Sequence, residues 1–224
     1  MIRRADMRYK AVVFDFDLTL ADSSGAIIDC YKHTLSEFGY PLPSDREIFE
    51  TIGKTLLDSF TILTGVSDDM KKEEMRKIYV AHADKVMASG TRFYPETLSL
   101  LDGLGERGVK TAVVSSKMKY RIEETFMYHY GRVPVDLIIG LHDMPKPKPA
   151  PDGLLLAAEQ LDVGAEDVLY VGDSFIDAET AANAKVDFAA VTTGPTLRSE
   201  FESYPNICIC GSLSELRETI YNIR

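Results

Sequence analysis

Two aspartates, Asp15 and Asp17, follow a short apolar run near the start of the chain. The run is Val-Val-Phe at residues 12–14, and β-branched and aromatic residues of this kind predict a buried strand. Because a buried carboxylate costs free energy unless another group pairs it, we expect the strand to leave the core just before Asp15. Both side chains then enter a crevice, where paired carboxylates suit Mg²⁺ binding and phosphoryl transfer.

The composition is that of an ordinary globular protein. The chain has 224 residues, of which 45% are hydrophobic and 27% are charged, a size typical of one large domain or of one domain with a smaller insertion. The net charge of −10 argues against a nucleic-acid partner, because such partners require clustered basic residues. The composition does not define the oligomeric state, and we expect a monomer or a weak dimer.

Cysteine usage and hydropathy bear on the compartment. The chain has three cysteines, and an odd number without dense spacing favours a reducing compartment over a disulfide framework. Cys208 and Cys210 are best explained as alternate residues of a late apolar strand. No segment approaches the roughly 20 apolar residues of a membrane span, and no signal peptide is recognisable. We therefore expect a cytoplasmic protein without a membrane partner.

About 90 residues of mainly helical pattern separate the first strand from the next one, which is predicted at 109–115. Apolar side chains recur at three- and four-residue steps, for example at Ile27, Tyr31 and Leu35. A crossover between parallel strands normally needs only a dozen or so residues. The excess predicts a helical domain at 22–90, inserted into a core formed by 1–21 and 91–224.

Regular alternation of strands and helices follows this segment. Predicted strands at 109–115, 135–140, 168–172 and 188–192 are separated by helical patterns. Such alternation predicts an α/β fold with a parallel sheet and right-handed crossovers. Sites in such folds lie outside the carboxyl ends of the strands.

Polar residues occupy several of these strand ends. They are Ser115 and Ser116, then Lys148 in a proline-rich loop, then Asp173 and Asp177. Each has a structural explanation: the serines could cap a helix, the lysine could be solvated, and the aspartates could favour a helix N-terminus. Their joint occurrence in this order, together with the first pair of aspartates, favours a functional site.

Four motifs carry a family resemblance. They are Asp15-Phe16-Asp17-Leu18-Thr19, Ser115 at the end of its strand, Lys148-Pro149-Ala150-Pro151, and Gly172-Asp173-Ser174-Phe175-Ile176-Asp177. With them the chain resembles the haloacid dehalogenase superfamily of phosphohydrolases, and within it the branch of phosphoglycolate phosphatase and β-phosphoglucomutase. The resemblance implies a Rossmann-like parallel sheet with an inserted α-helical cap domain.

The resemblance also implies a role for each motif residue. Asp15 is the nucleophile that forms an aspartyl-phosphate, and Asp17 is the general acid and base. Mg²⁺ is held by the side chains of Asp15 and Asp173 and by the backbone carbonyl of Asp17. By the same resemblance, Ser115, Ser116 and Lys148 bind the phosphate, and Asp177 supports the metal.

Three residues distinguish this chain within the superfamily. Asp17 argues for phosphatase or mutase chemistry, because the dehalogenase and phosphonatase branches do not carry aspartate there. Leu18 departs from the glycine of many relatives and could alter how the following loop moves. Lys54, within Gly53-Lys54-Thr55 between two predicted helices, could meet an anionic group of the substrate or could simply be a surface lysine.

The sequence therefore predicts a Mg²⁺-dependent phosphatase acting on a small phosphorylated metabolite. A sugar-phosphate mutase would use the same residues and is the nearest alternative. A phospho-accepting signalling module also combines acidic residues, a hydroxyl, a lysine and Mg²⁺. Such modules have about half this length and no counterpart of the helical segment, so this alternative is less favoured.

Overall fold

The side chains of the first strand, β1 (Ala11–Phe14), point alternately to the two faces of the sheet. Val12 and Phe14 belong to one hydrophobic cluster, and Ala11 and Val13 belong to another. Helices cover both faces, so neither face favours polar residues and the whole strand is apolar. This explains the uninterrupted apolar run that precedes Asp15.

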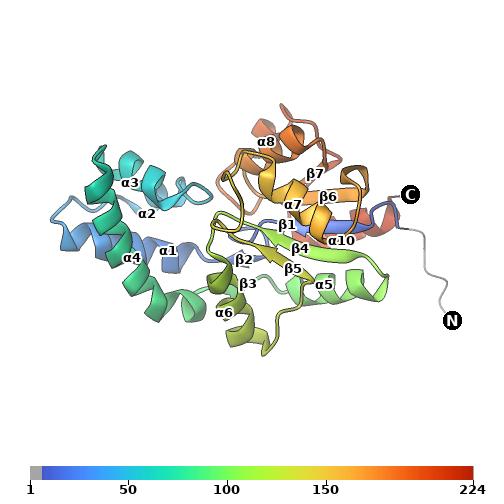
Figure 1. Cartoon of the computed structure of the whole chain (residues 1–224), viewed down its shortest axis with the longest axis horizontal. Coiled ribbons are helices and arrows are strands. Elements are labelled where there is room, and N and C mark those ends of the chain that lie inside the picture. Colours follow the sequence, from blue (N-terminus) through green and yellow to red (C-terminus); the bar gives the residue numbers. More distant parts are fainter. Residues whose placement is uncertain (1–6, 224) are drawn as a thin grey trace.

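The computed structural model describes residues 7–223 and contains a parallel sheet in the order β5-β4-β1-β6-β7-β8 (Figure 1). Its other strands are β4 (Lys110–Val114), β5 (Leu137–Ile139), β6 (Val168–Gly172), β7 (Asp187–Val191) and β8 (Cys208–Cys210). All five ladders between neighbouring strands are parallel. The α/β prediction is confirmed; the strand predicted at 168–172 matches β6, and the ends of the other predicted strands differ by no more than two residues.

Two groups of helices cover the sheet. One face packs against α5 (Thr97–Glu106), α6 (Lys119–Tyr130) and α10 (Leu213–Asn222). The other packs against α7 (Asp152–Gln160), α8 (Phe175–Ala184) and α9 (Arg198–Phe201), and a 3₁₀ turn, η1 (Ala165–Asp167), precedes β6. The helices α9 and α10 are not among the elements predicted from the sequence.

Four further helices form a separate group, here called the helical unit. They are α1 (Ser24–Glu37), α2 (Asp45–Phe49), α3 (Leu56–Thr64) and α4 (Asp69–Gly90), and they lie to one side of the sheet in Figure 1. Their apolar faces share a third hydrophobic cluster, in which Phe60 and Met75 are fully buried. The helical unit thus has a core of its own.

Local signals set the ends of these helices. Ser44 caps α2 in a capping box with Glu47, and Gly65 ends α3 in the left-handed conformation at φ 74°. Glycine adopts that conformation without a steric penalty. None of the helices described over residues 7–223 combines the length and the apolar character that crossing a membrane requires.

Short connections join the helical unit to the sheet. The chain leaves through β2 (Ala21–Asp22) and returns through β3 (Arg92–Phe93), which pair antiparallel. A further link is the ion pair of Arg121, on α6, with Asp84 on α4. The strands β2 and β3 have two residues each, too few for a strand pattern to appear in the sequence.

Met75 and Met70 offer a matched test of the core of the helical unit. Both lie on α4, but Met75 is fully buried whereas Met70 is 79% exposed. We expect Met75→Ala to lower the free energy of unfolding by about 2–5 kcal/mol, because it leaves a cavity. Met70→Ala should change it by less than about 0.5 kcal/mol. Urea unfolding followed by circular dichroism measures both, and equal losses would contradict the described packing.

Candidate active site

The site lies where the strand order changes direction. From β1 the chain continues to β4 and β5 on one side and then to β6, β7 and β8 on the other. The carboxyl ends of β1, β4 and β6 are therefore neighbours, and crevices at such points bind ligands in open α/β sheets. Asp15, Ser115 and Asp173 each follow one of these three strands directly.

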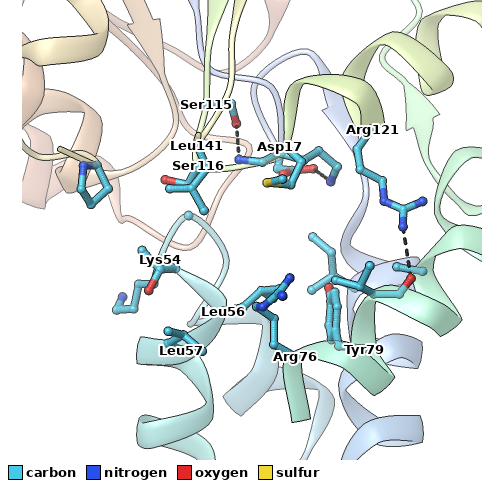
Figure 2. Close-up of a pocket in the computed structure, with 18 of the residues that line it drawn as sticks. Asp17, Lys54, Leu56, Leu57, Arg76, Tyr79, Ser115, Ser116, Arg121 and Leu141 are labelled. Carbon is cyan, nitrogen blue, oxygen red and sulfur yellow. Dashed lines mark hydrogen bonds and ion pairs between the residues drawn. The ribbon is translucent and has the colours of Figure 1, made fainter. Parts of the chain in front are cut away.

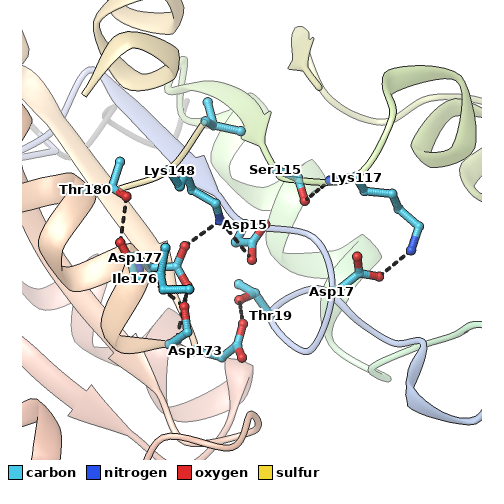
Figure 3. Close-up of polar contacts among 12 residues, drawn as sticks. Asp15, Asp17, Thr19, Ser115, Lys117, Lys148, Asp173, Ile176, Asp177 and Thr180 are labelled. Carbon is cyan, nitrogen blue, oxygen red and sulfur yellow. Dashed lines mark hydrogen bonds and ion pairs between the residues drawn. The ribbon is translucent and has the colours of Figure 1, made fainter. Parts of the chain in front are cut away.

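Three carboxylates meet at this point. Oxygen atoms of Asp15, Asp173 and Asp177 lie within 4.8 Å of one another, and all three residues are buried. Lys148 enters the group from its loop, with Nζ 3.1 Å from Asp15 Oδ2 and 2.6 Å from Asp177 Oδ1 (Figure 3). One ammonium group thus pairs with two of the three buried carboxylates.

Burial and mutual repulsion change the pKa values in this cluster. Burial raises the pKa of Asp15 to about 6, although the Lys148 ammonium opposes the change. Burial, with repulsion from Asp177, also raises the pKa of Asp173 well above its usual range. Burial alone would lower the pKa of Lys148, but Asp15 and Asp177 outweigh this effect and raise it. The cluster therefore favours additional positive charge.

The chemistry of the donor set fits a divalent cation. Asp15 Oδ1 is buried and has no hydrogen-bond partner within residues 7–223, and an unsatisfied buried carboxylate oxygen is costly. A Cβ atom at Gly194 would lie 1.8 Å from Asp173 Oδ2, so only glycine leaves room for that carboxylate. Hard oxygen ligands of this kind suit Mg²⁺.

Neighbouring hydroxyl groups hold the carboxylates in place. Thr19 Oγ1 donates a hydrogen bond to Asp173 Oδ1 at 2.7 Å, and Tyr170 donates from its hydroxyl to Asp177 Oδ1 at 2.8 Å. The hydroxyl and backbone N–H of Ser174 donate to Asp177 Oδ2. Both oxygens of Asp177 are thus engaged by protein groups, which agrees with a supporting position.

Asp17 is separated from the three carboxylates. Its side chain turns toward Lys117, whose Nζ lies 2.6 Å from Asp17 Oδ1, and toward Ser23, which donates to the same oxygen. Figure 3 shows this side chain directed away from Asp15. The structure therefore places Asp17 at the rim of the site, held by two residues that the sequence analysis did not identify.

Leu18 lies between the two halves of the molecule. Its φ is 60°, in the left-handed region that favours glycine, which explains why glycine suits this position. The side chain is 1% exposed and packs into the cluster of the helical unit. On the other side, Thr193 donates a hydrogen bond to the Leu18 carbonyl.

A cavity of about 570 Å³ opens between the site and the helical unit. Ser115 is buried at its edge, and Ser116 and Asp17 line it across from Lys54 (Figure 2). The Lys54 ammonium lies 5.4 Å from the centre of the Phe175 ring, on α8. All eight predicted site residues thus border the cavity or the carboxylate cluster beneath it.

Four residues at the site were not predicted from the sequence, each for a different reason. Thr19 lies within the first motif, and Lys117 directly follows Ser115-Ser116. Their place near the site could be inferred from the sequence, but the residues with which they form hydrogen bonds could not. Tyr170 is a tyrosine in an apolar strand, a weak sign of a buried polar contact. Arg76, on α4, lines the cavity, and nothing in its local sequence marks it.

Comparison with protein families decides the assignment. The family model described as haloacid dehalogenase-like hydrolase matches residues 12–191. The chain belongs to this family. It is therefore a haloacid dehalogenase-like hydrolase, and the four motifs quoted above lie within the matched region.

Individual relatives agree with the family. Pyrophosphatase PpaX of Bacillus cereus is 29% identical over 97% of this chain and 99% of its own. A crystal structure of a haloacid dehalogenase-like hydrolase from Bacteroides fragilis is 43% identical, with a TM-score of 0.90 over 93% of this chain and 99% of the other. A predicted phosphoglycolate phosphatase from Haemophilus somnus has a TM-score of 0.87 over 96% of this chain and 99% of the other. Its 18% identity supports the shared fold alone.

The Thr19 hydrogen bond can be tested by removing one hydroxyl. We expect Thr19→Val to weaken divalent-cation binding by about 10- to 100-fold, because the group that orients Asp173 is lost. Thr180→Val is the matched control, since Thr180 is equally buried but donates to the backbone carbonyl of Ile176. Calorimetric titration with Mg²⁺ measures the affinity. Equal losses in both variants would show that Thr19 has no special role.

Proposed function

We propose that this protein is a Mg²⁺-dependent phosphatase that hydrolyses a small phosphorylated metabolite through an aspartyl-phosphate intermediate. The observation that carries the proposal is the cluster of three buried carboxylates opposed by one lysine, with one Asp15 oxygen unpaired. A phosphate dianion could not approach this cluster without an added cation, because like charges repel. Mg²⁺, when bound, would neutralise charge on the phosphate and on the attacking carboxylate.

Asp15 is the proposed nucleophile. Its Oδ1 forms a bond to phosphorus while the ester bond to the leaving oxygen breaks. Water then attacks the aspartyl-phosphate, which releases inorganic phosphate and restores the carboxylate. Lys148 holds Asp15 Oδ2 at 3.1 Å, which leaves Oδ1 free to react.

The remaining motif residues have supporting roles in the proposal. Asp17 protonates the leaving oxygen through Oδ2 and then accepts a proton from the attacking water, while its Oδ1 keeps the contact with Lys117. Ser115, Ser116 and Lys148 bind the phosphate oxygens. Asp15 and Asp173 would hold Mg²⁺ with the backbone carbonyl of Asp17, and Asp177 would support it.

We also propose that residues 22–90 act as a cap domain over a core made of 1–21 and 91–224. The separate hydrophobic cluster of the helical unit supports this division, although residues 1–6 lie outside the described part of the chain. The cap would exclude water and select the substrate. In the proposal Lys54 contacts the bound substrate from the cap.

The names of the relatives support phosphate chemistry. PpaX is named a pyrophosphatase, and structural neighbours include a predicted phosphoglycolate phosphatase. Both names describe small phosphorylated substrates. We propose a substrate of that class for this chain.

Asp15→Asn tests the nucleophile. We expect phosphate release from small phosphomonoesters to fall by at least about 10³-fold, because the amide cannot form the covalent intermediate. Asp69→Asn is the control, since that side chain is 90% exposed on α4. Release of phosphate without an isomerised product would separate the phosphatase from the mutase alternative. Near-normal turnover by Asp15→Asn would refute the mechanism.

Mg²⁺ affinity should depend on pH. Because burial raises the pKa of Asp15 to about 6, this carboxyl carries a proton at pH 5 that the cation must displace. We expect the affinity to fall about tenfold per pH unit below about pH 6 for each proton displaced. Calorimetry at pH 5, 6, 7 and 8 measures this trend, with Asp173→Asn as a variant that should bind weakly throughout. An affinity that is constant from pH 5 to pH 7 would contradict the assignment.

A further inference from the structure

We infer that the leaving group of the substrate is an uncharged organic group with an apolar segment of several carbon atoms. The inference rests on the proposed phosphatase function and concerns the half of the cavity away from the carboxylates. It distinguishes this chain from an enzyme whose leaving group is a second phosphate, as in pyrophosphate. The walls, the charges and the size of the cavity all favour such a group.

The walls of the cavity carry apolar side chains that are not packed in a hydrophobic core. Leu57 and Val80 come from the helical unit, and Met118 and Leu141 come from the sheet side. All four are partly exposed, and none belongs to the three hydrophobic clusters of the described residues. Figure 2 shows Leu57 and Leu141 on opposite sides of the cavity. Apolar side chains left exposed on facing walls suit an apolar ligand group.

Most cations at the cavity are already paired with carboxylates. Lys117 pairs with Asp17 at 2.6 Å. Arg121 pairs with Asp84 on α4, and its side chain is 6% exposed. These two side chains therefore offer little free positive charge to a ligand.

Arg76 is paired as well, through one edge of its guanidinium. Its Nε and Nη2 atoms donate to the two carboxylate oxygens of Glu73 at 2.7 and 2.6 Å. This bidentate pair offsets the positive charge of Arg76 and occupies one of the two edges through which its guanidinium could bind a phosphate. Lys54 has no ion pair within residues 7–223, and its ammonium faces the Phe175 ring instead.

A leaving phosphate would therefore enter a cavity with apolar walls, in which Lys54 is the one lysine or arginine without an ion pair among residues 7–223. Two negative charges would lose hydration there without adequate compensation. An uncharged alcohol has no such penalty. The volume of about 570 Å³ also lies within the range of about 300–1,000 Å³ typical of pockets for organic ligands, and exceeds the need of a single phosphate group.

A series of n-alkyl phosphates tests the inference at constant charge. With Mg²⁺, kcat/KM should rise about fourfold for each methylene from methyl to pentyl phosphate, because each added group leaves water for an apolar wall. Pyrophosphate should have a lower kcat/KM than pentyl phosphate. A flat or falling series, or a preference for pyrophosphate, would overturn the inference.

Two variants on α3 provide a matched comparison. Leu57→Gln should lower the ratio of kcat/KM for pentyl phosphate to that for methyl phosphate by about tenfold, since it places an amide on the apolar wall. Ile62→Gln makes a similar change from an apolar side chain to an amide. The Ile62 side chain is 56% exposed and is not part of the cavity lining, so this variant should leave the ratio unchanged. Equal effects of the two variants would count against the cavity as the binding site.

Binding of n-alkylphosphonates separates this inference from the proposed function. Calorimetry should show pentylphosphonate binding much more tightly than methylphosphonate to the Mg²⁺-loaded protein, whether or not any ester is hydrolysed. Chain-length-dependent binding without phosphate release would refute the phosphatase but support the apolar subsite. Hydrolysis that depends on Asp15 but not on chain length would support the phosphatase and refute the subsite.

Discussion

The organisation of this protein depends on how three buried carboxylates are tolerated at one end of a parallel sheet. Within residues 7–223, Lys148 is the one cation that pairs with this cluster of Asp15, Asp173 and Asp177, through Asp15 and Asp177. Hydroxyl groups of Thr19 and Tyr170 contribute hydrogen bonds, but these do not remove the excess negative charge. Such a cluster lowers stability unless a cation joins it. The protein therefore retains an arrangement that is unfavourable for folding alone and suitable for binding a metal and a phosphate.

The sheet makes this arrangement possible because its central strands end side by side. The carboxyl ends of β1, β4 and β6 place acidic and hydroxyl groups from distant parts of the chain within a few ångströms. Helices pack on both faces and exclude water from the strands, but they leave this edge open toward the helical unit. The cavity between the two parts combines a charged floor with largely apolar walls.

Much of this organisation could be predicted from the sequence, because the relevant signals are local. Apolar runs marked the strands, Gly65 and Ser44 marked helix ends, and the carboxylates at strand ends marked the site. Individual side-chain contacts of residues outside the motifs could not be predicted when the partner lies far away in the chain. The pairing of Lys117 with Asp17 joins positions 100 residues apart, and Lys117 alone would be interpreted as a surface charge.

The packing of Leu18 has a mechanical consequence. This residue belongs to the loop between Asp17 and Thr19, yet its side chain lies in the core of the helical unit while its carbonyl is bound by Thr193. A rotation of the helices would pull on the side chain, whereas the sheet would resist through the carbonyl. Leu18 thus ties the loop that carries Asp17 to both halves of the molecule, so the position of that loop depends on how the two halves are arranged.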